Sequence, residues 1–269
     1  MFDFSSLNEA NIRLGVFVGV FLILALLESL IPRRHQRISK LFRWTNNISI
    51  SIINTLALRL TLPILATGMA IVAHENSLGL FNWIELPFWL ACILSFLLLD
   101  FVIYLQHRLF HAVPLLWRLH RMHHTDLEFD VTTAIRFHPI EIVLSMVIKL
   151  IVIAAIGAPA LAILIFEIVL NASAMFNHSN IKLPLGFDKY CRLVIVTPDM
   201  HRVHHSVHQI ETDSNFGFNL PWWDRLCGTY IDQPRDDHLN MKIGIEEFRE
   251  QKDSRVDQML IQPLRNDHF

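Results

Sequence analysis

Charged residues are scarce in this sequence. Asp, Glu, Lys and Arg together make up 18% of the 269 residues, whereas a soluble domain carries about 25%. Hydrophobic residues reach 52% and the mean hydropathy is +0.38, which predicts a surface that faces lipid. The formal net charge of −2 leaves no basic surface for nucleic acid. The length allows one compact domain and little room for a second.

Several signatures of other metal and redox proteins are absent. The three cysteines, Cys92, Cys191 and Cys227, lie far apart and form no C-x-x-C pair, which argues against a disulfide framework and a cysteine zinc site. Arg108 follows His107, and no H-E-x-x-H motif of a zinc protease occurs anywhere. The sequence also has no G-x-G-x-x-G nucleotide motif, no iron–sulfur cysteine cluster and no fused haem domain. If the chain catalyses a redox reaction, we therefore expect a separate protein to supply the electrons.

Long apolar runs are what the sequence has instead. Residues 12–31 are long enough to cross about 30 Å of hydrocarbon as a helix, and the run is too long for a cleaved signal peptide. Basic residues are frequent in the stretch that follows, 33–43. Because positive charge is retained on the cytoplasmic side, this stretch predicts an external N-terminus.

Two further spans are expected at residues 48–72 and 87–104. The first is interrupted by Pro63 and by Arg59, which we expect to pair with a buried acid or to snorkel to the interface. The loop between the spans, 73–86, contains no Lys or Arg, as expected of an external loop. The span at 87–104 therefore returns the chain to the cytoplasmic side.

The next two apolar runs, 140–156 and 158–175, are separated by Gly157 and Pro159. Each run is near the lower limit for spanning, and the residues between them favour a turn, so we expect a helical hairpin. The remainder, 179–269, is polar and contains no span.

These runs predict an all-α integral membrane protein with about four to five transmembrane or hairpin helices and a cytoplasmic, histidine-rich helical cap. We expect N-terminal transmembrane helices in residues 1–85, a second part carrying the histidines in 86–232, and a polar C-terminal tail in 233–269. Within the tail, the apolar residues of 243–264 are expected to lie on the domain or on the membrane surface.

Histidine is abundant, with fifteen in the chain. One H-x-x-x-H motif and two H-x-x-H-H motifs contain eight of them, and a ninth follows the hairpin. Residues three and four apart on a helix share a face at about 5–6 Å, which suits joint metal ligation. Adjacent residues diverge by about 100° and can serve two neighbouring ions. The predicted metal ligands are His107, His111, His120, His123, His124, His178, His201, His204 and His205.

Nine nitrogen ligands exceed what one ion uses, since zinc usually takes about four, so we expect two ions. Imidazole suits iron, zinc, copper and nickel, and ligand type alone leaves the metal open. The alternative without metal is a set of helix-surface histidines, which the recurrence of H-x-x-H-H argues against. The alternative without catalysis is a metal-binding or metal-transport membrane protein. A transporter should have polar residues along its spans, whereas these spans offer little beyond Arg59 and Lys149.

The histidine motifs resemble those of the fatty acid hydroxylase and sterol desaturase superfamily of membrane di-iron enzymes. The resemblance covers residues 86–230, roughly half of the chain, and identifies 86–232 as a fatty acid hydroxylase-like catalytic domain. It also includes three stretches outside the histidine motifs: 136–141, 212–217 and 223–230. Some relatives have another histidine four residues before the one that matches His178, whereas this chain has Ala174 there.

The resemblance implies two Fe ions, with Zn possible as purified, and O2 as co-substrate. It implies hydroxylation, desaturation or ether cleavage at a C–H bond of a lipid, with sterol, fatty acyl, carotenoid and ether lipids all open. Electrons would come from a separate donor of the ferredoxin, rubredoxin or cytochrome b5 type. We expect the histidine cluster and the C-terminus to be cytoplasmic, and a bacterial inner membrane in preference to the endoplasmic reticulum.

Residues that orient the ligand rings are also expected, because a metal-bound histidine donates its other N–H to a carboxylate or carbonyl. Asp100 shares a helix face with His107, and we expect Glu141 to hold Arg136. The predicted orienting residues are Asp100, His138, Asp199, Asn215 and Asp224, with Asp126 and Asp130 as further candidates. The histidines expected on the surface are His35, His74, His208, His238 and His268.

Overall fold

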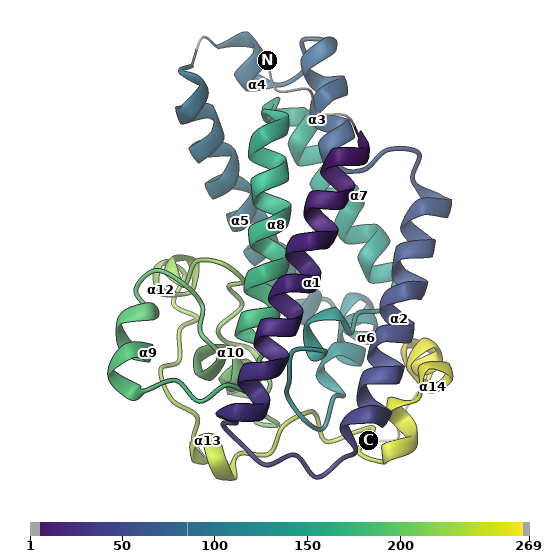
Figure 1. Cartoon of the computed structure of the whole chain (residues 1–269), viewed down its shortest axis with the longest axis vertical. Helices are drawn as coiled ribbons and strands as arrows, with labels where there is room; N and C mark the ends of the chain where they lie inside the picture. The colour runs from purple at the N-terminus through teal and green to yellow at the C-terminus, as the bar shows by residue number, and fades with distance from the viewer. Residues whose placement is uncertain (1–5, 85, 266–269) are drawn as a thin grey trace.

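The computed structural model describes residues 6–84 and 86–265, and within them it contains helices and no β-strand. The long helices form a bundle (Figure 1): α1 Ser6–Leu30, α2 Lys40–Thr61, α5 Phe88–Ala112, α7 Pro139–Ile156 and α8 Ala160–Asn177. The shorter helices are α3 Ala66–Glu75, α4 Leu80–Trp83, α6 Pro114–His124, α9 Leu185–Cys191, α10 Pro198–His204, α11 Gln209–Thr212, α12 Trp222–Leu226, α13 Asp237–Asn240 and α14 Val256–Ile261. Short 3-10 helices are η1 Thr133–Ile135, η2 Gln251–Ser254 and η3 Gln262–Leu264.

Five helical stretches of the described chain are long and apolar enough to cross a membrane. They are Glu9–Leu30, Lys40–Trp83, Phe88–Ala112, Pro139–Ile156 and Ala160–Asn177. Large apolar side chains such as Leu22, Leu60 and Ile151 are exposed on these helices, as expected where a helix faces lipid. The prediction of an all-α, multi-pass membrane protein is therefore confirmed.

The second predicted span consists of two helices. Ser39 caps α2, because its hydroxyl oxygen accepts a hydrogen bond from the backbone N–H of Phe42. The helix ends at Thr61, two residues before Pro63, which has no N–H to donate and whose ring clashes with the preceding turn. The chain becomes helical again at Ala66, so the expected interruption separates α2 from α3.

Helices α7 and α8 form the predicted hairpin. At the turn, Gly157 has a φ of 67°, in the left-handed region that glycine adopts without strain. A Cβ atom there would lie 2.6 Å from the side-chain nitrogen of Asn82, and Gly79 packs against the same turn. This close approach attaches the loop before α5 to the end of the hairpin.

The bundle has two distinct ends (Figure 1). Helices α3 and α4 lie at one end with the α7–α8 turn, whereas α6, α10 and α13 lie at the other. All of the histidine motifs are at this second end, the histidine end, because α5 and α8 also run towards it. The basic stretch 33–43 follows α1 at the same end. The side of the membrane that this end faces stays a prediction.

The C-terminal segment packs on the helices of the histidine end. Met259 of α14 lies in a buried cluster with Ile50 of α2 and Met122 of α6. The guanidinium of Arg118 donates to the carbonyl of Pro263 at 2.6 Å. The apolar residues of the C-terminal segment therefore contact the domain.

A buried ion-pair network connects α2 to the loop after α6. Arg43 is fully buried and donates to Asp126 with an Nη2–Oδ2 distance of 2.7 Å, and it also pairs with Asp130. Burial alone would raise the pKa of Asp126, but Arg43 and Arg136 outweigh it and hold that pKa at about 2. Asp126 and Asp130, candidates for orienting a ligand ring, are thus occupied by Arg43.

Candidate metal centre

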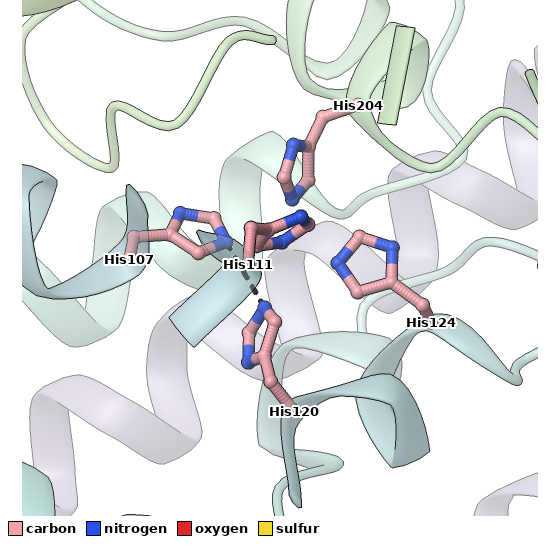
Figure 2. Close-up of side chains that lie close together, drawn as sticks. All are labelled: His107, His111, His120, His124 and His204. Atoms are coloured by element: carbon pink, nitrogen blue, oxygen red, sulfur yellow. Dashed lines mark hydrogen bonds between the residues drawn. The ribbon is translucent and has the colours of Figure 1, made fainter. Parts of the chain in front are cut away.

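Five imidazoles from three helices converge at the histidine end of the bundle (Figure 2). His107 and His111 lie on α5, His120 and His124 on α6, and His204 on α10. One ring nitrogen from each of them lies within 4.8 Å of the others. We call these residues the five-histidine group.

A second group contains the other four predicted metal ligands. It consists of His123 on α6, His178 directly after α8, His201 on α10 and His205 directly after α10. Their ring nitrogens also lie within 4.8 Å of one another, and all four residues are buried. We call this the four-histidine group.

Helix geometry separates neighbouring histidines between the two groups. His123 and His124 point into different groups, and so do His204 and His205. The ring centroids within each adjacent pair are 5.4 Å apart. Because adjacent residues on a helix differ by about 100° in direction, each H-x-x-H-H motif contributes ring nitrogens to both groups. The two groups are therefore neighbours that share α6 and the α10 segment.

The buried ring nitrogens have the arrangement that a metal ion requires. His111 Nε2, His204 Nε2 and both ring nitrogens of His124 and His205 are buried without a hydrogen-bond partner among the described residues. A buried polar atom left unpaired is costly, and a metal ion removes that cost. The donor set of neutral nitrogens suits a first-row transition metal.

Several nitrogens also lie at the spacing of ligands on one ion. The Nε2 atoms of His107 and His120 are 3.1 Å apart, and His178 Nε2 lies 3.0 Å from that of His123 and 3.1 Å from that of His201. Two nitrogens each about 2.0–2.1 Å from one ion lie about 3 Å apart. The residues therefore fit a metal in each group.

The electrostatic environment keeps the rings neutral. Burial and the neighbouring imidazoles hold the pKa of His123, His124 and His204 well below the ordinary value of 6.5. Burial also lowers the pKa of His178 to about 4. A neutral imidazole is the form that binds a metal ion, so the site is ready for ligation at neutral pH.

The carboxylate of Glu141, which we expected to hold Arg136, instead holds the imidazole ring of His120. Glu141 accepts from His120 Nδ1, with an oxygen–nitrogen distance of 2.6 Å. The expectation that Glu141 holds Arg136 is wrong, because Arg136 donates instead to the Met122 carbonyl, Asn47 and Thr125. No local spacing rule connects Glu141 to a histidine 21 residues earlier, although it lies in the stretch 136–141 that carried the family resemblance.

A turn of four residues, 214–217, orients two more rings. The carbonyl of Ser214 accepts from His204 Nδ1 at 2.6 Å, and the carbonyl of Phe216 accepts from His107 Nδ1 at 2.8 Å. Asp224 holds this turn by accepting from the backbone N–H groups of Phe216 and Gly217. Burial raises the pKa of Asp224 to about 6, against the lowering effect of those hydrogen bonds. Asp224 therefore acts on His107 through the turn.

Asn215 supports the same turn from inside. Its side-chain nitrogen donates to the carbonyls of Met200 and Ile231, and its side-chain oxygen accepts from the Ile231 N–H. It has a positive φ of 48°, which asparagine tolerates better than most residues. Asn215 thus joins α10 to the segment after α12.

The remaining predicted orienting residues hold other groups. Asp100 accepts from Asn219, Leu220 and Trp223, and so connects α5 to α12 and the loop before it. His138 caps α7, because its Nδ1 accepts from the backbone N–H of Ile140. In this position it supports the start of the helix that carries Glu141.

Asp199 forms ion pairs away from the histidine groups. It binds Arg33 at 3.0 Å and also Arg202, and thereby connects the end of α1 to α10. A residue that sequence reasoning did not single out, Asp213, contacts the centre: its Oδ1 lies 3.2 Å from His111 Nδ1. The sequence feature that could have identified Asp213 is its position in 212–217, one of the stretches that carry the family resemblance.

One histidine expected on the surface is buried. His238 is 5% exposed and lies 3.7 Å from Asp199, so its assignment to the surface is wrong. The reason is that α13 folds back against α10, which local sequence does not indicate. His35 and His74 are exposed, as expected, and His208 is half-buried. His268 lies outside the described residues.

A cavity of about 650 Å³ leads from the five-histidine group into the bundle. His107 and His120 form part of its wall at the histidine end, together with Ala174 and Phe218. The rest of the wall comes from α1, α2, α3, α5, α7 and α8. Its volume lies in the range of small-molecule sites. The cavity therefore connects the five-histidine group with the interior of the helix bundle.

A helical membrane bundle with two buried groups of imidazole nitrogens at one end defines a polyhistidine membrane protein whose histidines could hold metal ions. Comparison with known proteins specifies it further. The family model for fatty acid hydroxylases matches residues 92–229, just over half of the sequence, and the chain belongs to this family. The predicted resemblance is confirmed.

Curated relatives share part of the chain. It is 31% identical to an ornithine lipid hydroxylase of Rhizobium tropici, over 58% of this chain and 46% of that protein. It is 29% identical to the human alkylglycerol monooxygenase, over 51% of this chain and 29% of that protein, and 27% identical to a fatty acid hydroxylase of a Lecanicillium species, over 58% and 46%. The chain thus spans less than half the length of these relatives. No solved structure matches it.

Proposed function

We propose that the nine histidines bind two metal ions, one in the five-histidine group and one in the four-histidine group. The support is the set of buried nitrogens without hydrogen-bond partners, together with nitrogen–nitrogen distances near 3 Å between facing rings. The groups share α6 and the α10 segment, which favours a coupled pair of ions over two independent sites.

We propose iron as the metal and lipid oxidation as the reaction. Curated relatives are named hydroxylases and a monooxygenase of lipids, which favours hydroxylation over desaturation. Iron bound here would supply activation of O2 for attack on a C–H bond. Zinc bound on purification is compatible with the same ligand set.

The protein's own residues have separate roles in this proposal. Glu141 and the carbonyls of Ser214 and Phe216 fix the tautomer and direction of three ligand rings. The apolar wall of the cavity, including Phe110 and Phe218, keeps water away and admits a hydrocarbon. His107 and His120 bring the five-histidine group to the cavity, so the reacting carbon would lie beside them.

We further propose that residues 86–232 are the catalytic domain and that the histidine end faces the cytoplasm. The basic stretch 33–43 at that end supports this orientation. The cytoplasmic face would then receive electrons from a separate donor of the ferredoxin, rubredoxin or cytochrome b5 type. A bacterial inner membrane is the proposed location, and a bacterial relative supports it.

Metal content per chain is the test of this proposal. We expect about two iron ions per wild-type chain after purification in mild detergent, and a marked loss in His204→Ala. The matched control is His74→Ala, since His74 is exposed at the opposite end of the bundle. Two zinc ions would call for iron reconstitution and measurement of lipid-dependent O2 uptake. Less than one metal per chain, unchanged in His204→Ala, would refute the proposal.

A further inference from the structure

The cavity is charged at the end remote from the histidines. Glu9 and Arg13 of α1, Arg59 of α2, Lys149 of α7 and Glu167 of α8 all line it. On α7, Lys149 follows Glu141 by eight residues, which places it about 12 Å further along the helix axis. Apolar residues line the wall between these ends: Phe17, Leu58, Ile142, Met146 and Leu170.

The two carboxylates at this end already have cationic partners. Glu167 binds Lys149 Nζ at 2.5 Å and Arg13 Nη2 at 2.8 Å. Glu9 binds Arg13 Nη1 at 3.2 Å and accepts from the Thr67 hydroxyl at 2.7 Å. Glu141, the remaining carboxylate of the cavity wall, lies at the histidine end against His120. No carboxylate at the remote end is therefore left to attract a cation.

Positive charge is in excess at the same place. Three cations face two carboxylates, and Arg59 is exposed with no ion pair to any residue that the structure describes. An ammonium has three N–H donors and a guanidinium five, more than the carboxylates use. Charged residues inside a membrane are costly and usually functional. The remote end therefore suits a group with anionic oxygens.

The cavity also has access to lipid. Helix α1 packs on α8, and α2 packs on α7. Residues of both α1 and α2 line the cavity. Leu14 and Thr55 are exposed members of these two walls. These exposed lining residues point to the side between α1 and α2 as the route by which an amphiphile would enter from the bilayer.

We propose that Arg13, Arg59 and Lys149 bind the anionic headgroup of an amphiphile whose tail extends along the cavity to His107 and His120. The headgroup would fix how far the tail reaches towards the histidines, so the substrate class is an anionic lipid with one tail that extends along the cavity and is oxidised there. This inference rests on the proposed function for its reaction, although binding itself needs no turnover.

Binding of matched probes tests it. We would measure binding of radiolabelled dodecyl phosphate, dodecanoate and dodecyltrimethylammonium to the metal-loaded protein in phosphatidylcholine nanodiscs, against empty nanodiscs. The anionic probes should bind about tenfold more tightly than the cationic one, as expected for one charge-assisted contact. A preference for phosphate would indicate a phosphate-type headgroup, and a preference for dodecanoate a free acid.

Two variants localise the effect. Lys149→Met leaves Glu167 paired with Arg13, and Arg59→Gln removes a cation that has no ion pair, so the second variant keeps its fold even if the first does not. Each should lose about tenfold in affinity for the anionic probes, whereas Lys182→Met, the same loss of charge at an exposed site outside the cavity, should not.

The outcomes separate this inference from the proposed function. Equal binding of anionic and cationic probes, or anion binding unaffected by Arg59→Gln and Lys149→Met, would refute the headgroup site even if iron and O2 uptake are found. A charge-selective site in a chain that binds no metal would refute the proposed function and leave the headgroup site standing.

Discussion

Glu141 contacts a ring of the candidate metal centre although it lies 21 positions from that histidine in sequence. Its contact with His120 Nδ1 fixes which nitrogen of that ring faces the five-histidine group. A carboxylate in this position also raises the basicity of the ligand nitrogen. Two other rings depend on backbone carbonyls, at Ser214 and Phe216, which no side-chain substitution removes directly. Glu141 is therefore the residue through which ring orientation can be tested.

We predict that Glu141→Gln weakens metal binding by about 10–100-fold, the usual effect of removing a partner of a ligand histidine. The amide keeps the size of the side chain and can still accept from His120, but it has no negative charge. The measurement is a chelator-competition titration with the purified protein. Glu75→Gln, at an exposed position of α3, is the matched control. Unchanged affinity in Glu141→Gln would mean that the charge of Glu141 does not support the site.

At the scale of elements, the α6 segment depends on α2 for its position. Helix α6 carries three of the nine histidines, but it has only eleven residues and is marginal as an isolated helix. Arg43 of α2 reaches Asp126 and Asp130, directly after that helix, and Arg136 donates to the Met122 carbonyl within it. Buried charge from α2 and from the segment before α7 thus holds the short helix α6 in place.

We predict that Asp126→Asn lowers the free energy of unfolding by about 1–3 kcal/mol, because it leaves the buried guanidinium of Arg43 with Asp130 as its one remaining carboxylate. Thermal unfolding in detergent, followed by circular dichroism, measures the change. Asp257→Asn removes an exposed ion pair with Arg255 and should have little effect. Equal stability of the two variants would show that the Arg43 network does not support the fold.

At the scale of the whole molecule, charge and chemistry are distributed unequally between the two ends. The loop at the α3–α4 end contains no Lys or Arg, whereas the basic stretch 33–43 and all nine predicted ligands belong to the histidine end. The same asymmetry underlies the predicted orientation, since basic loops remain in the cytoplasm.

Cysteine labelling tests the orientation. In a chain with Cys92 and Cys191 replaced by Ala, Cys227 is exposed at the histidine end, and Glu75→Cys introduces a thiol at the other. A membrane-impermeant maleimide should label position 75 in intact cells and Cys227 only after permeabilisation. Labelling of Cys227 in intact cells would place the histidine end outside.

Local sequence determines the features that repeat along one element. Apolar runs long enough to span, the break at Pro63 and the turn at Gly157 follow from hydrophobic length and backbone chemistry, and the structure contains all of them. The histidine motifs likewise identify eight rings that can gather, because three- and four-residue spacing places them on neighbouring parts of a helix face, and His178 is added by its position after the hairpin. Their role as ligands stays a prediction for the metal measurement.

Only the tertiary structure decided what depends on contacts between distant segments. It divided the nine histidines into groups of five and four, assigned Glu141 to His120, buried His238, and brought Arg13, Lys149 and Glu167 together in one cavity. Glu167 and Arg13 are separated by 154 positions, and helical periodicity has no information at that range. The packing of α1 on α8 creates that contact, and packing is a property of the whole bundle.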